Sequence, residues 1–240
     1  MARSTRRTQA QDPLEELVQL ALDLDLTTLA AALPALLVRA EKESLSFTAF
    51  GLDLLRTETS ARRTRRLERS HRRSRLGTIE GIDGFNFSIR PQLEARVVKE
   101  LLNCRFVEEK RNVLCLGKPG LGKTRIAKAI VHAACLAGHS TLCVVTAEML
   151  EDLHASQADG SFRRAMRRYV KPDVLLLDEF AYEPFDAQAT TYLWRVVAAR
   201  HGQASTVLTS NTGFTDWKNL FPSEAQAVAT GECQGSCRTI

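Results

Sequence analysis

A glycine-rich segment that ends in a lysine and a threonine has the residue types needed to surround a phosphate group. Residues 117–124 read GKPGLGKT and fit the pattern G-x-x-x-x-G-K-[ST]. Glycines allow the backbone to fold with its N–H groups pointing at phosphate oxygens, and a following helix adds the positive end of its dipole. We expect Lys123 to reach the β- and γ-phosphates of ATP and Thr124 to ligate Mg²⁺. The predicted ATP-binding residues are Gly117, Lys118, Pro119, Gly120, Leu121, Gly122, Lys123, Thr124 and Arg125.

Two further apolar runs end in polar residues that suit the same chemistry. The run VLLLDEF at 174–180 carries Asp178 and Glu179. Because ligands of an α/β sheet bind at the carboxyl ends of its strands, we expect Asp178 to bind Mg²⁺ and Glu179 to orient or deprotonate the attacking water. The alternative for this acidic pair is simple polar capping of the strand. The run TVLTSN at 206–211 carries Asn211, which we expect to hold the attacking water or contact the γ-phosphate, with a turn or helix-cap role as its alternative.

Short apolar runs that alternate with longer amphipathic stretches are expected to position these residues. The predicted strands are Asn112–Leu116, Thr141–Val145, Val174–Leu177 and Thr206–Thr209. The predicted helices lie at about 91–103, 123–137, 147–153, 159–169 and 186–200. Strands separated by helices favour parallel pairing, so we predict an α/β domain with a parallel sheet.

The segment before residue 84 has a different texture and predicts a small all-helical domain. Apolar residues recur there at helical spacing from Pro13 to about Arg75. Asp12 before a proline marks the start of the first helix, and Ser46 is the expected cap of the third. Glycines then break the pattern, which indicates a linker that ends near residue 84. We predict a helical domain at 1–84, an ATPase domain at 85–230 and an irregular tail at 231–240.

Positive charge is concentrated at the end of the third predicted helix. The chain has a formal net charge of +5, and residues 62–75, RRTRRLERSHRRSR, hold eight arginines and one glutamate. Like charges one turn apart destabilise an isolated helix, and the phosphates of a DNA duplex would relieve this repulsion. A solvated connector is the alternative. The predicted DNA-binding residues are Arg62, Arg63, Arg65, Arg66, Arg69, Arg72, Arg73 and Arg75.

Composition excludes several classes of protein. Of the residues, 44% are hydrophobic and 25% are charged, which is typical of a globular chain rather than a disordered one. No window has the roughly 18 uninterrupted apolar residues of a membrane-spanning helix, and the start lacks the apolar stretch of a signal peptide. We therefore expect a cytoplasmic protein that does not bind membranes. The six cysteines are interpreted as buried thiols, and the spacing of Cys233 and Cys237 does not favour zinc.

The three motifs, in this order, resemble the AAA+ branch of P-loop ATPases. More narrowly, the chain resembles the IstB-like family, the ATPase helpers of bacterial insertion sequences, which are similar to the helicase loader DnaC and the initiator DnaA. The resemblance runs from about residue 14 to about 229. It is carried by the segments LRTETSARRTRRLERS, FNFSIRP, LGKPGLGKT, SQADGSF, LLLDEFAYEPFD and TSNTGFTDW. It implies binding of ATP and double-stranded DNA, assembly of a homo-oligomer on DNA, and activation of a transposase encoded by the same element.

The chain departs from the family pattern at its end. The last ten residues, GECQGSCRTI, have no apolar periodicity, so we expect the further strand and helical lid of AAA+ proteins to be missing and ATP hydrolysis to be weakened. A DnaC-like helicase loader and a non-hydrolysing remnant are the alternative functions. Phe85 and Phe87 are interpreted as core residues, with packing near the adenine as the alternative. Arg200 is interpreted as a surface residue, with contact to a neighbouring subunit's nucleotide as its alternative.

Overall fold

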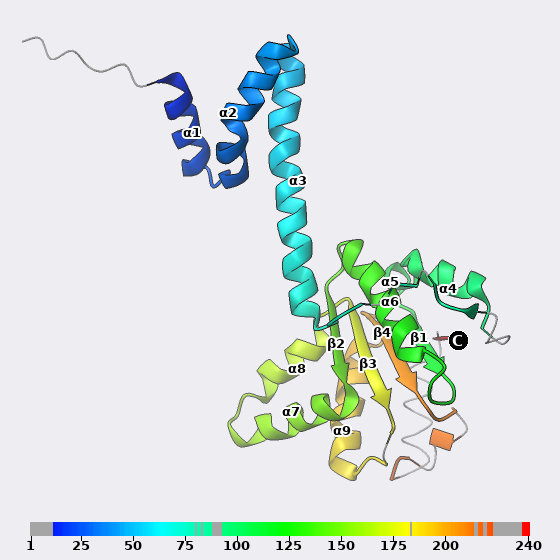
Figure 1. Cartoon of the computed structure of the whole chain (residues 1–240). Coiled ribbons are helices and arrows are strands. Elements are labelled where there is room, and N and C mark those ends of the chain that lie inside the picture. Colours follow the sequence, from blue (N-terminus) through cyan, green and yellow to red (C-terminus); the bar gives the residue numbers. More distant parts are fainter. Residues whose placement is uncertain are drawn as a thin grey trace, which may run out of the picture. The chain divides into compact units, whose positions relative to one another are not determined.

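The chain forms two compact units. The structure is a computed structural model that describes residues 12–79, 81–82, 84–87, 93–182, 184–213, 216–217, 220–222 and 237–240. Unit 1 comprises residues Met1–Arg66 and unit 2 comprises residues Leu67–Ile240. Figure 1 shows the helices of unit 1 and the sheet of unit 2. Among the described residues, no helix is both long and apolar enough to cross a bilayer.

Unit 1 is built from the helices α1 (Pro13–Asp23), α2 (Thr27–Lys42) and the first part of α3 (Phe47–Ser74). The Asp12 carboxylate accepts a hydrogen bond from the backbone N–H of Leu14 at 3.0 Å, which confirms the predicted start of α1. The Ser46 hydroxyl accepts one from the backbone N–H of Ala49 at 3.2 Å, as a cap of α3 does. The predicted continuation of this third helix into the arginine segment is confirmed.

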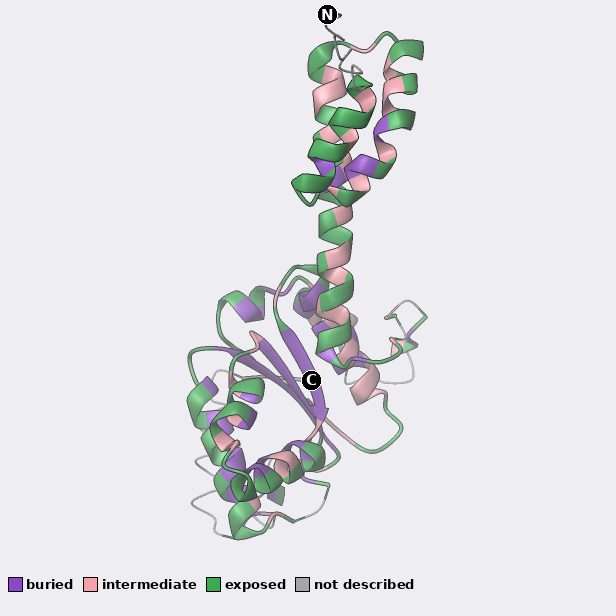
Figure 2. Ribbon diagram, turned by 90° about the vertical axis from the view of Figure 1, so that its left-hand side faces the viewer, coloured by how far each residue is buried: buried purple, intermediate pink, exposed green. Residues whose placement is uncertain are grey.

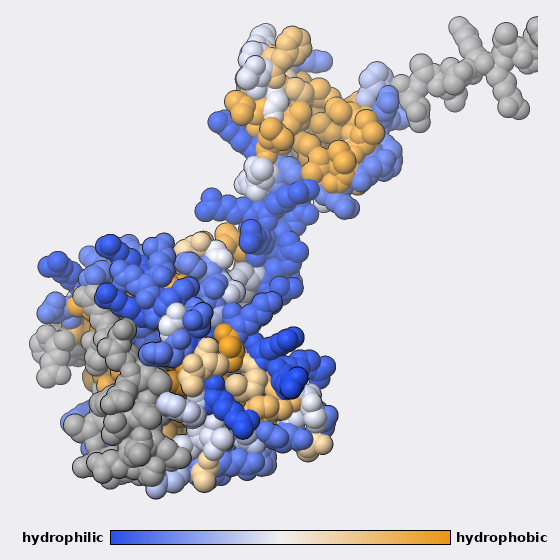
Figure 3. Space-filling model, turned by 180° about the vertical axis from the view of Figure 1, so that it is seen from behind, coloured by the Kyte–Doolittle hydropathy of each residue, from blue (hydrophilic) through white to orange (hydrophobic). Residues whose placement is uncertain are grey.

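The core of unit 1 is small. Its buried apolar side chains are Ala21, Leu29, Ala30 and Leu33. Several large apolar side chains of the same helices are exposed, among them Leu20, Val38 and Phe47, and Figure 3 shows apolar surface gathered on this unit. Because a helical unit with so small a core has little apolar burial to stabilise it, individual polar contacts carry more weight there.

Unit 2 is an α/β domain around a parallel sheet, as the sequence predicts. The sheet has the strand order β2-β3-β4-β1-β5. The strands are β1 (Asn112–Leu116), β2 (Thr141–Val145), β3 (Val174–Phe180), β4 (Ser205–Ser210) and β5 (Cys237–Thr239). The helices are α4 (Ala95–Leu102), α5 (Arg105–Glu108), α6 (Lys123–Leu136), α7 (Thr146–Ala158), α8 (Phe162–Val170) and α9 (Ala187–Arg200).

Helices cover both faces of this sheet, and the strands are buried between them (Figure 2). Leu175 and Leu177 of β3 pack in a cluster with α7, α8 and α9, whereas Val174 and Leu176 pack with α4, α5 and α6. This alternation follows from the two-residue period of a strand. It explains why the predicted strands were continuous apolar runs, since a strand with two covered faces has no polar side.

The end of the chain differs from the sequence-based expectation. We expected no regular structure in the last ten residues, but Cys237–Thr239 form β5, which pairs in parallel with β1. A strand of three residues is too short to produce a periodic pattern, so the sequence could not indicate it. Residues 231–236 and the side chains of Cys233 and Cys237 lie outside the described part. The expected lack of a lid stays a prediction.

Arg200 is also placed differently from either sequence-based interpretation, because it is buried and only 2% exposed. Its guanidinium donates to the carbonyl oxygens of Tyr169 at 2.9 Å and Pro172 at 2.8 Å, and to that of Ser205 at 2.5 Å. Burial lowers the pKa of Arg200 to about 10. Arg200 therefore links α9 to the segments that lead into β3 and β4. These contacts lie at the amino-terminal ends of the strands, whereas the P-loop lies at their carboxyl ends.

Candidate functional site

The predicted P-loop connects β1 to α6 and has the backbone conformation that its glycines permit. Gly117, Gly120 and Gly122 have φ values of 152°, 79° and 85°, which side-chain-bearing residues rarely adopt. A Cβ atom at Gly117 would lie 3.2 Å from the side chain of Leu121. The strand, loop and helix order that phosphate binding needs is therefore present, with the first turn of α6 at the end of the loop.

Lys123 is positioned over this loop. Its ammonium group donates a hydrogen bond to the carbonyl oxygen of Lys118 at 2.9 Å. Burial lowers the pKa of Lys123, while Cys115 and Asp178 act in the opposite direction. Burial also raises the pKa of the Cys115 thiol to about 12, so this thiol is neutral. Lys123 is thus a partly desolvated cation beside the backbone N–H groups of the loop, which is a suitable partner for a phosphate.

The carboxylate of Asp178, on β3, joins the residue that follows the P-loop lysine to the neighbouring strand β4. Its Oδ1 atom accepts hydrogen bonds from the hydroxyl of Thr124 at 2.9 Å and from that of Thr209 at 2.5 Å. The backbone carbonyl of Asp178 accepts a further bond from the Thr146 hydroxyl at 2.9 Å. Asp178 is only 6% exposed. The two predicted Mg²⁺ ligands, Thr124 and Asp178, therefore lie in direct contact.

Glu179 has the opposite exposure. Its side chain is exposed while those of its neighbours in β3 are buried. Its backbone has a φ of 55°, and the register between β3 and β4 is irregular between Leu177 and Phe180. A residue with a Cβ atom in this left-handed conformation carries about 1 to 2 kcal/mol of strain. The strained turn directs the carboxylate of Glu179 out of the sheet, next to the buried Asp178.

Thr209 is a site residue that the sequence reasoning missed. Its hydroxyl donates to Asp178 and also accepts a hydrogen bond from the backbone N–H of Glu179 at 3.0 Å. It thereby fixes both members of the acidic pair from the neighbouring strand β4. The signal that would have found it is a hydroxyl residue at the end of the same TVLTSN run in which only Asn211 was considered.

Asn211 directly follows β4 and is exposed. The residue before it, Ser210, accepts a hydrogen bond through its carbonyl oxygen from the backbone N–H of Gly117 at 3.2 Å. Asn211 therefore lies at the start of the P-loop, on the same edge of the sheet as Asp178. Its contact with water or phosphate stays a prediction.

Arg125 and two aromatic residues belong to one contact beside the first turn of α6. The Arg125 guanidinium donates to the carbonyl oxygen of Gly81 at 2.8 Å and lies 5.7 Å from the centre of the Phe85 ring. The rings of Phe85 and Phe87 are 4.8 Å apart, and both pack on the buried cluster around α6. Phe85 is a buried core residue, as expected, and Phe87 is partly buried against the same cluster, whereas a nucleotide contact of Arg125 stays a prediction.

The eight arginines of residues 62–75 differ in their contacts with the rest of the protein. Glu58 of α3 is buried, accepts a hydrogen bond from the backbone N–H of Leu29 at 3.2 Å and pairs with Arg62 at 2.9 Å and Arg65 at 3.3 Å. Arg65 also donates to the hydroxyl of Thr28 at 2.9 Å. Two of the eight predicted DNA-binding arginines are therefore engaged in the packing of unit 1. The side chains of the other six are exposed, namely Arg63, Arg66, Arg69, Arg72, Arg73 and Arg75.

The strand order, the P-loop after β1 and the acidic pair at the carboxyl end of β3 form a P-loop α/β fold like that of AAA+ domains. The fold is similar to that of AMPPCP-bound DnaA from Aquifex aeolicus, with a TM-score of 0.58, 17% identity and coverage of 69% of this chain and 51% of that chain. It is also similar to the DnaC helicase loader, with a TM-score of 0.54, 18% identity and coverage of 70% and 96%. The chain belongs to the IstB-like ATP binding protein family, which matches residues 19–231.

Two of the relatives that match this chain in sequence are proteins of insertion sequences. A protein of insertion sequence IS5376 from Geobacillus stearothermophilus, named as ATP-binding, is 31% identical over 86% of this chain and 82% of its own length. A protein of IS21 from Pseudomonas aeruginosa, named in the same way, is 32% identical over 90% of this chain and 82% of its own length.

Of the cysteines, Cys104, Cys115, Cys135 and Cys143 are buried free thiols, as expected.

Proposed function

We propose that this chain is an ATP-hydrolysing, DNA-binding helper that assists the transposase of an insertion sequence. The observation that carries the proposal is the hydrogen bond between Thr124 and Asp178, which joins the P-loop to the acidic strand end. The insertion-sequence origin of the relatives supports the choice of process. The same fold serves replication proteins, so the fold alone does not favour transposition.

In this proposal each residue of the candidate site has one role in ATP hydrolysis. Lys123 neutralises the β- and γ-phosphates, Glu179 takes a proton from the attacking water or orients it, and Asn211 holds that water or the γ-phosphate. The backbone N–H groups of the loop bind the remaining phosphate oxygens. The exposed Glu179 beside a buried Asp178 fits this division, because one carboxylate is available to water while the other is fixed.

Thr124 and Asp178 are the residues that would hold Mg²⁺. A hydroxyl and a carboxylate that already share a hydrogen bond form an all-oxygen donor set, and Mg²⁺ prefers such donors together with substrate phosphates. The ion neutralises negative charge on the phosphates when it is bound. Thr209 is a positioning residue, because it orients the Asp178 carboxylate without being placed against the phosphates.

DNA binding is assigned to the exposed arginines of α3, and the partner is the transposase of the same element. The chain is proposed to assemble as a homo-oligomer on double-stranded DNA in the cytoplasm. The exposure of five arginine side chains on α3, with Arg75 directly after it, supports backbone contacts rather than base readout. The alternative function is that of a DnaC-like helicase loader. A transposase gene beside the coding sequence would favour the transposition helper over the helicase loader.

The test is a phosphate-release assay on the full chain with ATP and Mg²⁺, with and without double-stranded DNA. We expect turnover that DNA stimulates, and its loss in Glu179→Gln with ATP affinity unchanged, because the amide keeps the shape but not the basicity. Glu148→Gln, an exposed residue in the first turn of α7, is the matched control. Absence of turnover in the unaltered chain would favour the non-hydrolysing alternative, and normal turnover in Glu179→Gln would place the base elsewhere.

A further inference from the structure

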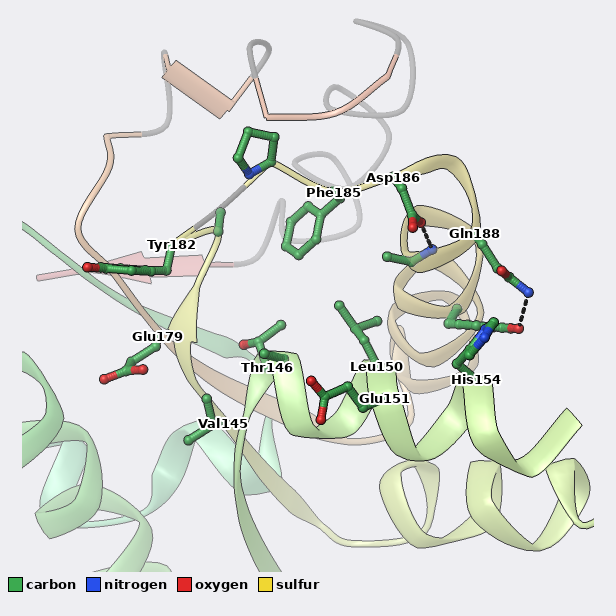
Figure 4. A pocket seen from close by; sticks show the side chains of 15 residues that line it. Val145, Thr146, Leu150, Glu151, His154, Glu179, Tyr182, Phe185, Asp186 and Gln188 are labelled. Carbon is green, nitrogen blue, oxygen red and sulfur yellow. Dashed lines mark hydrogen bonds between the residues drawn. The ribbon is translucent and has the colours of Figure 1, made fainter. Parts of the chain in front are cut away.

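A pocket of about 530 Å³ lies beside Glu179 and has no role in the chemistry described above. Its walls come from the carboxyl ends of β2 and β3, from the connection between β3 and α9, from α7 and from the first half of α9. Figure 4 shows Leu150 and Phe185 pointing into it from opposite sides. The P-loop is not among the lining residues, so this is a separate site that shares Glu179 with the nucleotide site.

The pocket combines negative charge with aromatic walls. In the part of the chain that the structure describes, its lining includes the carboxylates of Glu151, Glu179 and Asp186 and the imidazole of His154, but no lysine or arginine. The amino-terminal ends of α7 and α9 add about half a positive charge each, which three carboxylates exceed. Asp186 is held as the cap of α9 by the backbone N–H of Ala189 at 2.6 Å. Among the described residues, neither Glu151 nor Glu179 forms an ion pair.

The apolar part of the lining is suited to a long side chain. The aromatic rings of Tyr182, Phe185 and Tyr192 line the pocket, and Gln188 fixes Tyr192 by donating to its hydroxyl at 2.7 Å. An aliphatic stem packs against such surfaces while its charged head reaches a carboxylate, and aromatic faces attract a cation. In Figure 4 the carboxylate of Glu151 extends from α7 toward the strand end, where such a head would arrive.

We propose that this pocket binds a basic side chain, an arginine or a lysine, of a partner polypeptide. Charge complementarity carries the assignment, because the lining presents three carboxylates and, among the residues described, no lysine or arginine. A nucleotide or a DNA phosphate would meet three carboxylates there and is disfavoured for the same reason. The partner segment is therefore basic, with apolar residues beside the basic one to contact the aromatic walls.

Occupation of the pocket has a consequence for hydrolysis. Because Glu179 and Glu151 line the same pocket and Glu179 also lies next to Asp178, a cation bound beside Glu151 would attract the Glu179 carboxylate and change its position. A partner could thereby change the rate of ATP turnover without touching the nucleotide. This consequence rests on the proposed function, whereas binding of the basic side chain does not.

The test uses a short fluorescent peptide with one arginine between leucines, titrated against the full chain by fluorescence anisotropy at low salt. The matched peptide carries citrulline, which keeps the shape of arginine and removes its charge. We expect the arginine peptide to bind at least about tenfold more tightly, and Glu151→Gln to remove most of this difference. Tyr182→Ala is a second variant that weakens both peptides, and Glu148→Gln outside the pocket should change neither.

The outcomes separate this proposal from the proposed function. Equal affinity of the two peptides, or arginine-peptide binding that Glu151→Gln leaves unchanged, would overturn the pocket assignment even if Glu179→Gln stops turnover. Selective binding of the arginine peptide supports the assignment even if Glu179→Gln leaves turnover normal, in which case only the proposed base is wrong. A change of turnover on addition of the arginine peptide, absent with Glu151→Gln, supports both.

Discussion

The hydroxyl of Thr209 lies 2.5 Å from the Oδ1 atom of Asp178 and links β4 to the acidic end of β3. The same hydroxyl accepts a hydrogen bond from the backbone N–H of Glu179. One side chain on a neighbouring strand thus orients a buried carboxylate and anchors the strained turn that presents an exposed one. This arrangement gives two adjacent acids different environments, which is what different roles in one reaction require.

Thr209→Val tests whether this hydroxyl positions the acidic pair. Valine keeps the volume of threonine but loses both hydrogen bonds, so Asp178 should hold Mg²⁺ less well. We expect ATP turnover to fall by about 10- to 100-fold at low Mg²⁺ and to recover partly at high Mg²⁺. Phosphate release measured across a Mg²⁺ titration checks this. Thr191→Val, on the exposed side of α9, is the control, and equal Mg²⁺ curves for both variants would contradict the prediction.

Lys123→Ala tests the P-loop assignment. The variant removes the side-chain cation that arches over the loop, so ATP affinity should fall by at least about a hundredfold. Calorimetric titration with ATP and Mg²⁺ measures this directly. Lys99→Ala, an exposed lysine on α4, serves as the control. Retained affinity in Lys123→Ala would mean that nucleotide binds elsewhere.

A pair of variants at position 179 tests the strain at the site. Glu179→Gly and Glu179→Ala both lose the carboxylate, so both should lose turnover. Only glycine adopts a φ of 55° without strain. The free energy of unfolding of Glu179→Gly should therefore exceed that of Glu179→Ala by about 1 kcal/mol. Urea denaturation followed by tryptophan fluorescence reports on unit 2, because Trp194 and Trp217 both lie there. Equal stabilities would mean that position 179 carries no strain.

The parts of this molecule that follow from local sequence were predictable. The strands β1 and β2 have the predicted bounds, because a parallel strand buried on both faces leaves a continuous apolar run such as NVLCL or TLCVV. The predicted proximity of Thr124 and Asp178 is confirmed, because the P-loop pattern and a strand that ends in acids place these residues at the same end of a parallel sheet. The cap at Asp12 was found because proline follows it.

The parts that depend on distant contacts were not predictable. Arg200 and Arg65 looked like surface cations, since nothing near them in the sequence reveals the carbonyl groups or the buried Glu58 that they meet. Thr209 looked like an ordinary strand residue because its partner lies thirty-one positions away. The left-handed turn at Glu179 gave no signal either, because side-chain-bearing residues adopt it only where tertiary structure imposes it.

Acid should destabilise unit 1 through Glu58. The hydrogen bond from Arg62 is the largest factor that lowers the pKa of this carboxylate below its usual value of 4.5. A lowered pKa means that the charged form stabilises the fold, so this contribution is complete above about pH 4.5 and is lost as the pH falls through the lower folded value. The measurement is thermal unfolding of the helices of unit 1, followed by circular dichroism at several pH values. We expect the melting temperature of the unaltered chain to fall more on acidification than that of Glu58→Gln. Glu41→Gln, an exposed residue of α2, should keep the acid sensitivity of the unaltered chain.

The last prediction concerns DNA and uses the exposed arginines rather than the two that pair with Glu58. If the segment follows the duplex backbone through about four to six phosphates, the slope of log K against log [salt] should be near −4 to −5. Replacing four exposed arginines with glutamine should flatten this slope by up to about 3 to 4 units while ATP affinity is unchanged. Arg62 and Arg65 are left in place, because their removal would unpair a buried carboxylate. The four positions are Arg63, Arg66, Arg72 and Arg73.

A control variant removes the same charge from exposed positions on and around α4 and α5, namely Arg96, Lys99, Arg105 and Lys110. An equal loss of slope in both variants would mean that net charge alone attracts the duplex, and an unchanged slope in the first would mean that the arginine segment is a solvated connector.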